Sequence, residues 1–216
     1  QKDTKMVTSA IEYAFAEVYL KTKTVRPLLG QHFLIGEMIR KYVGKVLDRD
    51  NQLTPFYYIE SEKKMECLFQ LTDQREIHLK GYIDRIDEVN GRVRIIDYKS
   101  GSGTTLFTTV ENLFNREEKV RSKAVMQVFM YAWMYLQKKS EKTVQPGIYY
   151  MRDLFKTSFD PSIYRKIDRT KSEEVMDFED YRFDFEENLR HCLDEIFSKE
   201  TPFVQTNNQK TCSYCP

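Results

Sequence analysis

The segment from Gly81 to Gly101, GYIDRIDEVNGRVRIIDYKSG, carries the clearest structural pattern in this sequence. Apolar and polar residues alternate on both sides of Asn90-Gly91, a dipeptide that favours a two-residue turn because both residues tolerate a positive φ. We therefore expect an antiparallel hairpin, with strands at residues 77–87 and 92–99.

This register places two carboxylates opposite each other. Asp84 faces Asp97 and Tyr82 faces Lys99, and these four side chains share a face with two isoleucines. Directly opposed residues have Cβ atoms about 4.5–5.5 Å apart, where like charges destabilise the pair. A divalent cation compensates such a pair, because Mg²⁺ is typically held by one or two carboxylates together with water and phosphate oxygens.

The alternative is a hairpin at the surface with ordinary ion pairs, of which Asp87 opposite Arg94 on the other face is an example. The position of Asp84 and Asp97 among isoleucines favours a metal site over this alternative. Tyr98 turns its ring to the other face and leaves its carbonyl near the two carboxylates.

Three segments follow one another along the chain: Gly81 to Arg85, Asp97 to Gly101 and Gln127 to Tyr131. Their residues and their order resemble the PD-(D/E)XK nuclease superfamily, in its RecB-like branch of the AddB type. In that branch a Gly-x-hydrophobic-Asp strand and an Asp-Tyr-Lys-(Ser/Thr)-Gly strand form a hairpin, and a Gln-x-x-x-Tyr motif lies on the next helix. The resemblance covers about residues 62–215.

The resemblance implies an α/β, restriction-endonuclease-like core with a central mixed β-sheet flanked by α-helices. It also implies metal-dependent hydrolysis of DNA phosphodiesters, by an exonuclease that uses Mg²⁺ or Mn²⁺ in DNA repair or recombination. The implied metal ligands are Asp84, Asp97, the Tyr98 carbonyl and an acid on the preceding strand, for which Glu62 is the first choice and Glu66 the second.

By the same resemblance, Lys99 joins the two aspartates in the catalytic set and either positions the attacking water or stabilises developing charge. Gln127, Tyr131 and Arg85 are expected to support the site or to hold the DNA backbone. DNA is the expected partner, together with a helicase domain or subunit.

An iron-sulfur cluster is a further feature of some family members, which close it with four cysteines. Cys212-x-x-Cys215 resembles the beginning of such a set, whereas Cys67 and Cys192 occupy apolar, core-like positions. We therefore expect no cluster in this chain and assign any cluster to a longer, full-length protein. With so few cysteines, a reducing compartment such as the cytoplasm is expected.

Periodicity outside the hairpin divides the chain into two regions. Residues 1–54 predict an N-terminal helical hairpin, with apolar residues at three- and four-residue spacing. Residues 55–216 contain the expected strands and further helices, and the resemblance assigns them to the nuclease core. We expect one compact unit cut from a longer protein. Residues 123–138 predict a buried helix, and the basic residues of the preceding segment, 115–123, either contact phosphates or form a solvated loop.

The charge balance limits the possible functions. The chain has 34 Lys and Arg residues against 33 Asp and Glu residues, so no overall field of one sign marks a polyanionic partner. No apolar run is long enough to span a membrane. Two alternatives to an active nuclease therefore stay open: a catalytically silent nuclease-fold module that binds DNA or scaffolds a helicase–nuclease complex, and a protein-interaction domain.

Overall fold

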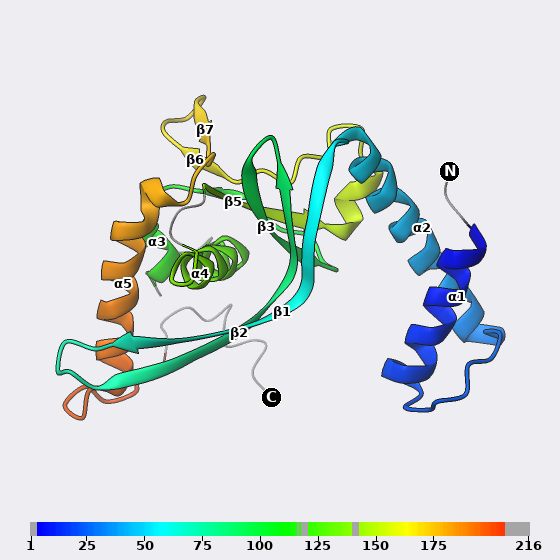
Figure 1. Cartoon of the computed structure of the whole chain (residues 1–216). Helices are drawn as coiled ribbons and strands as arrows, with labels where there is room; N and C mark the ends of the chain where they lie inside the picture. Colours follow the sequence, from blue (N-terminus) through cyan, green and yellow to red (C-terminus); the bar gives the residue numbers. More distant parts are fainter. Residues whose placement is uncertain (1–3, 116, 118–120, 140–142, 206–216) are drawn as a thin grey trace. The chain divides into compact units, whose positions relative to one another are not determined.

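The computed structural model describes residues 4–115, 117, 121–139 and 143–205 (Figure 1). The chain divides into two compact units. One comprises Gln1–Phe56 with Met151–Phe159, and the other comprises Tyr57–Tyr150 with Asp160–Pro216. We refer to them as the helical unit and the sheet unit.

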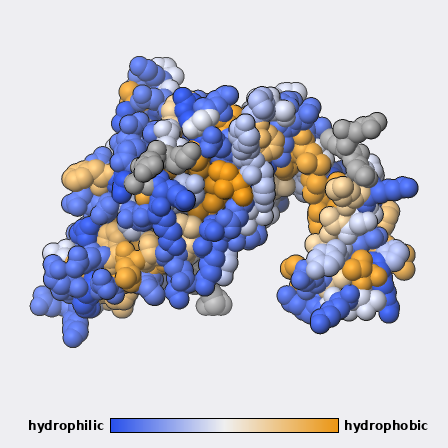
Figure 2. Space-filling model, viewed as in Figure 1, coloured by the Kyte–Doolittle hydropathy of each residue, from blue (hydrophilic) through white to orange (hydrophobic). Residues whose placement is uncertain are grey.

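The helical unit is built from the helical hairpin that the sequence predicts. Helix α1 (Thr4–Ala14) continues into a π-helical turn, η1 (Phe15–Tyr19), and α2 follows (Gly30–Gln52). A 3₁₀ turn, η2 (Met151–Phe155), joins them through the ring of Phe155, whose centroid lies 5.3 Å from that of Tyr42. Several apolar side chains of α2 remain at the surface (Figure 2), so this unit has a small core.

The sheet unit contains a four-stranded mixed sheet in the order β1-β2-β3-β5. Its strands are β1 (Phe56–Gln70), β2 (Glu76–Val89), β3 (Arg92–Lys99) and β5 (Val144–Tyr150). The β2–β3 pair is antiparallel and the β3–β5 pair is parallel. The predicted α/β fold with a mixed central sheet is therefore confirmed.

The register of the β2–β3 hairpin agrees with the sequence near the turn. Ile86 pairs with Ile95 and Asp87 pairs with Arg94. Asn90 and Gly91 have φ values of 52° and 78°, as a turn of two left-handed residues requires. The Asn-Gly dipeptide thus fixes the register of the strands that carry the candidate site.

Farther from the turn, β2 departs from the expected alternation. The β2–β3 ladder ends at Arg85 and Ile96, before the positions of the expected aspartate pair. Gly81 faces helix α4 so closely that a Cβ there would lie 2.8 Å from the Tyr131 ring. Ile86 also points inward, because it belongs to the buried core. In a regular strand, residues 81 and 86 would point to opposite faces, so the alternation of β2 is broken between them.

This change overturns one expectation. Tyr82 was expected to share the face of Ile86, but its neighbour Gly81 faces α4 and the Tyr82 side chain is 53% exposed. The pairing of Tyr82 with Lys99 is therefore wrong, because alternation from the turn does not continue past the end of the ladder.

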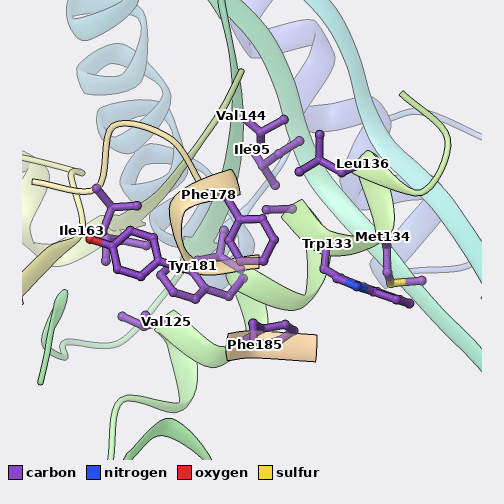
Figure 3. Packing of buried hydrophobic residues seen from close by; sticks show 14 of the residues in the cluster. Ile95, Val125, Trp133, Met134, Leu136, Val144, Ile163, Phe178, Tyr181 and Phe185 are labelled. Atoms are coloured by element: carbon purple, nitrogen blue, oxygen red, sulfur yellow. The ribbon is translucent and has the colours of Figure 1, made fainter. Parts of the chain in front are cut away.

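Helix α4 (Lys123–Leu136) covers the sheet and is buried on most of its surface, as predicted. Helix α5 (Glu179–Phe197) packs on it, with the ring centroids of Phe129 and Phe185 6.1 Å apart. Figure 3 shows Phe185 of α5 in this core together with Val125 and Trp133 of α4. A short helix and a three-stranded sheet complete the unit: α3 (Val110–Phe114), β4 (Leu106–Phe107), β6 (Tyr164–Lys166) and β7 (Ser172–Glu174). Across the described ranges, no helix is both long and apolar enough to cross a membrane.

Candidate active site

Two aspartates lie where the β2–β3 ladder ends. Asp97 is at the C-terminal part of β3, and its side chain is only 2% exposed. Asp84 accepts a hydrogen bond of 2.7 Å from the Tyr98 N–H through Oδ2. Burial raises the pKa of Asp97, the Lys99 ammonium opposes this rise, and the charge of Asp84 adds to it. Because Tyr98 directly follows Asp97, the hydrogen bond to the Tyr98 N–H places Asp84 near Asp97.

Lys99 brings a positive charge to this pair. Its Nζ lies 2.7 Å from Asp97 Oδ2 and donates to Gln127 Oε1 at 2.6 Å. Asp97 Oδ2 is buried and accepts no hydrogen bond of good geometry from the described residues, although the ammonium is near it. One ammonium therefore lies beside the Asp97 carboxylate, and a buried oxygen of that carboxylate keeps capacity for a further ligand.

Helix α4 contributes a hydrogen-bond acceptor for Lys99. Gln127 uses its Oε1 to accept from Lys99, and its Nε2 donates to the Tyr131 hydroxyl at 2.8 Å. Gln127 and Tyr131 are four residues apart and lie on one face of the helix. Tyr131 in turn packs against Gly81, where a side chain would collide with the ring. All three segments that the sequence singled out therefore meet at one place.

The structure does not bring Glu62 to the two aspartates. Glu62 is exposed on β1, where its φ is 50°. Glu66, the second choice, forms ion pairs with Lys64 at 2.7 Å and with Lys80 at 3.9 Å. Within the part of the chain that is described, no three Asp, Glu, His or Cys side chains are grouped so that they could hold a metal. Glu62 is therefore not among the proposed metal ligands.

Arg85 also has a different environment from the expected contact with DNA. Its side chain is 7% exposed, and its Nε donates to Asp87 Oδ2 at 2.7 Å. A buried guanidinium cannot reach a phosphate, so we leave Arg85 out of the proposed site. The sequence already indicated an ion pair for Arg85, because residues 85 and 87 share a strand face and Asp87 faces Arg94.

The donor set fits a divalent cation of the Mg²⁺ type. Two carboxylates suffice for such an ion when water and substrate phosphate oxygens supply the remaining ligands. The buried Asp97 Oδ2 and the position of Asp84 at the N–H of the next residue, Tyr98, are the observations that support this fit. Coordination by the Tyr98 carbonyl stays a prediction.

The cysteines do not add to the site among the described residues. Cys67 and Cys192 are partly buried, and burial raises the pKa of both thiols, which disfavours the thiolate form that binds metals. Cys212 and Cys215, which resemble the beginning of an iron-sulfur cluster motif, lie outside the described residues.

Comparison with known proteins agrees with this geometry. A family model described as the PD-(D/E)XK nuclease superfamily matches residues 2–216, which is nearly the whole chain. No curated protein matches the chain. The match extends over both the helical unit and the sheet unit.

Proposed function

Because the chain belongs to the PD-(D/E)XK nuclease superfamily, we propose that it is a divalent-metal-dependent deoxyribonuclease of the RecB-like branch. The observation that carries this proposal is the meeting of Asp84, Asp97 and Lys99 at the end of one hairpin, with Lys99 held by Gln127. A strand pair that served only as scaffold would gain nothing from a buried carboxylate beside a second one.

Asp84 and Asp97 would hold Mg²⁺ or Mn²⁺. Once bound, such an ion polarises the scissile phosphate and lowers the pKa of its bound water. The protein's own contribution is to keep two carboxylates fixed before the substrate arrives. The Tyr98 N–H fixes Asp84, and burial among apolar residues fixes Asp97.

Lys99 stabilises the charge that develops on the phosphate oxygens, or orients the attacking water. Its ammonium is aimed by a chain of hydrogen bonds from Lys99 to Gln127 and from Gln127 to Tyr131. Because this chain is already formed, the charge does not have to reorganise during the reaction, which is the most effective form of electrostatic stabilisation.

The finer assignment is an exonuclease that acts with a helicase in DNA repair or recombination. Its support is the Gln-x-x-x-Tyr motif of the RecB-like branch, which α4 presents to Lys99 through Gln127. A catalytically silent module that binds DNA or scaffolds a helicase–nuclease complex is the second candidate. One observation favours it: no third acidic ligand joins Asp84 and Asp97 within the described residues.

Digestion of linear and circular plasmid DNA tests the proposal. With Mg²⁺ or Mn²⁺ we expect loss of linear DNA, survival of covalently closed circles, and no digestion with EDTA. Asp97→Asn should remove the activity. Asp184→Asn is a matched control, because Asp184 is exposed on α5 and the same charge is lost.

The outcomes separate the two candidates. Digestion of circles with linear DNA would indicate an endonuclease instead of an exonuclease. Activity that survives Asp97→Asn would remove the assigned site. DNA binding without digestion in either metal would favour the silent module.

A further inference from the structure

A groove of about 600 Å³ opens beside Lys99 and Gln127 in the sheet unit. One wall is the segment that leaves β3, residues 99–104. The other is the segment that enters α4, from Arg121 to Gln127. The groove is therefore continuous with the candidate active site, since Lys99 and Gln127 belong to both.

The charge of this groove is one-sided. Lys99, Arg121 and Lys123 line it, and no Asp or Glu is among the described residues of its lining. Lys123 is exposed and Arg121 is partly exposed, and neither forms an ion pair with a carboxylate of the described chain. Lys99 is paired with Asp97, so the positive charge that remains without a carboxylate partner in the described chain belongs to Arg121 and Lys123. Such charge in a concave surface attracts anions, in contrast to the near-neutral chain as a whole.

The two walls are joined at a single carbonyl. Ser122 Oγ donates to the Thr104 carbonyl at 3.0 Å and accepts from the Val125 N–H at 3.3 Å, so it caps α4 and ties the loop to it. The Tyr150 hydroxyl donates to the same carbonyl at 3.4 Å. Arg121 and Lys123 flank this buried serine, and their backbone positions are therefore fixed relative to the loop.

The remaining lining indicates which part of a nucleic acid fits. Residues 100–104 present backbone, hydroxyl groups and glycines. Tyr150 is the aromatic residue of the described lining, and it is 7% exposed, so it offers no face for a base. Such a surface suits phosphate and sugar, which carry no sequence information, and not base stacking.

We propose that this groove binds the DNA backbone next to the scissile phosphate, with Arg121 and Lys123 as positioning residues that contact substrate phosphates. The proposal rests on the proposed function for the identity of the polyanion. It assigns substrate affinity to the segment before α4, which the sequence left open between a phosphate contact and a solvated loop.

The test compares two double variants with the same loss of charge. Arg121→Gln with Lys123→Gln removes the groove cations, and Arg169→Gln with Lys171→Gln removes an exposed arginine and lysine near β6 and β7. Binding of a fluorescein-labelled oligonucleotide is followed by anisotropy in EDTA over a range of KCl concentrations. We expect the groove variant alone to bind more weakly, and the slope of log K against log[KCl] to fall by about one unit for each DNA phosphate that is no longer neutralised.

A second pair of variants leaves the groove cations in place. A Cβ at Gly101 would meet nothing within 4 Å, so Gly101→Asp and Gly101→Asn should both fold. Gly101→Asp adds a negative charge to the groove and should weaken binding more than Gly101→Asn, which adds a side chain of nearly the same shape without the charge. In Mg²⁺ digestion, the groove double variant should raise KM and leave kcat unchanged, a split that a merely structural role would not produce.

The outcomes distinguish this proposal from the nuclease assignment. Weaker binding of the groove variants in a protein that digests no DNA would support the groove and remove the nuclease function. Wild-type affinity and salt slope in the groove double variant would overturn the groove, even if digestion proceeds. Equal losses of affinity in the two double variants, equal effects of Gly101→Asp and Gly101→Asn, or no binding by the wild type would also overturn it.

Discussion

The two faces of the β2–β3 hairpin each bury one aspartate, but they surround it differently. Asp87 is completely buried and receives three charged hydrogen bonds. Arg85 Nε donates one at 2.7 Å, and Arg94 donates two, at 2.6 and 2.8 Å. Asp97, almost equally buried, has one ammonium beside it and a second carboxylate near it.

This difference shows which aspartate is structural. Two guanidinium groups saturate Asp87, so its charge is compensated within the protein. The environment of Asp97 is incomplete, since burial and Asp84 both disfavour its charged form. A buried acid with too little compensation is costly to keep, which is typical of a site that awaits a ligand.

The largest effect on stability is expected on the saturated face. Asp87→Asn leaves Arg85 and Arg94 buried beside a neutral amide, and should lower the free energy of unfolding by about 3–5 kcal/mol. Urea unfolding measures this loss. Replacing the triad together, with Asp87→Leu, Arg85→Met and Arg94→Met, should recover most of it, because no unpaired charge then remains. A loss below about 1 kcal/mol in the single variant would contradict the structural role.

On the other face, the same substitution should change activity and not stability. Asp97→Asn should lower kcat/KM for DNA digestion by at least roughly 10²–10³-fold, the range seen when one electrostatic contact to a transition state is removed. Its unfolding free energy without metal should stay within about 1 kcal/mol of the wild type, because Lys99 keeps its bond to Gln127 and repulsion by Asp84 is relieved. A loss of stability like that of Asp87→Asn would remove the distinction between the faces.

The sequence predicted the two faces of the hairpin only where the strand register follows from the turn. Asn90-Gly91 sets the turn, and the register from Val89 to Arg85 follows from it. On the side of Arg85 away from the turn, the Asp84 side chain accepts a hydrogen bond from the Tyr98 N–H, and α4 packs on Gly81. Both events depend on tertiary contacts, so strand alternation alone misplaced Tyr82.

Sequence reasoning also differed between the proposed catalytic residues and their surroundings. Asp84, Asp97 and Lys99 could be singled out in the sequence because their motif is compact and lies on one hairpin. The closeness of Gln127 to Lys99 came from the family resemblance, since 28 residues separate them in the chain. The groove formed by residues 99–104 and the start of α4 was not predicted, because no local pattern indicates that these two loops are tied at Thr104.

A cation should stabilise only the face with incomplete compensation. At a Mn²⁺ concentration about 100 times the Kd, binding to the folded state adds about 2.7 kcal/mol to the free energy of unfolding. Thermal unfolding with and without Mn²⁺ should show this gain in the wild type and in Asp184→Asn, but not in Asp84→Asn. An equal gain in Asp84→Asn would place the cation elsewhere.

The smallest effect is expected from the residue that aims Lys99 through another side chain. Tyr131→Phe removes the hydroxyl that accepts from Gln127 Nε2, so the amide is no longer held in one orientation. By analogy with the outer-shell partners of metal ligands, whose loss costs roughly 10–100-fold, we expect kcat to fall by about tenfold with KM unchanged. Tyr135→Phe is the matched control, one helical turn along α4. An equal loss of kcat in both variants would assign the effect to packing of α4, whereas a loss confined to Tyr131→Phe would assign it to the orientation of Lys99.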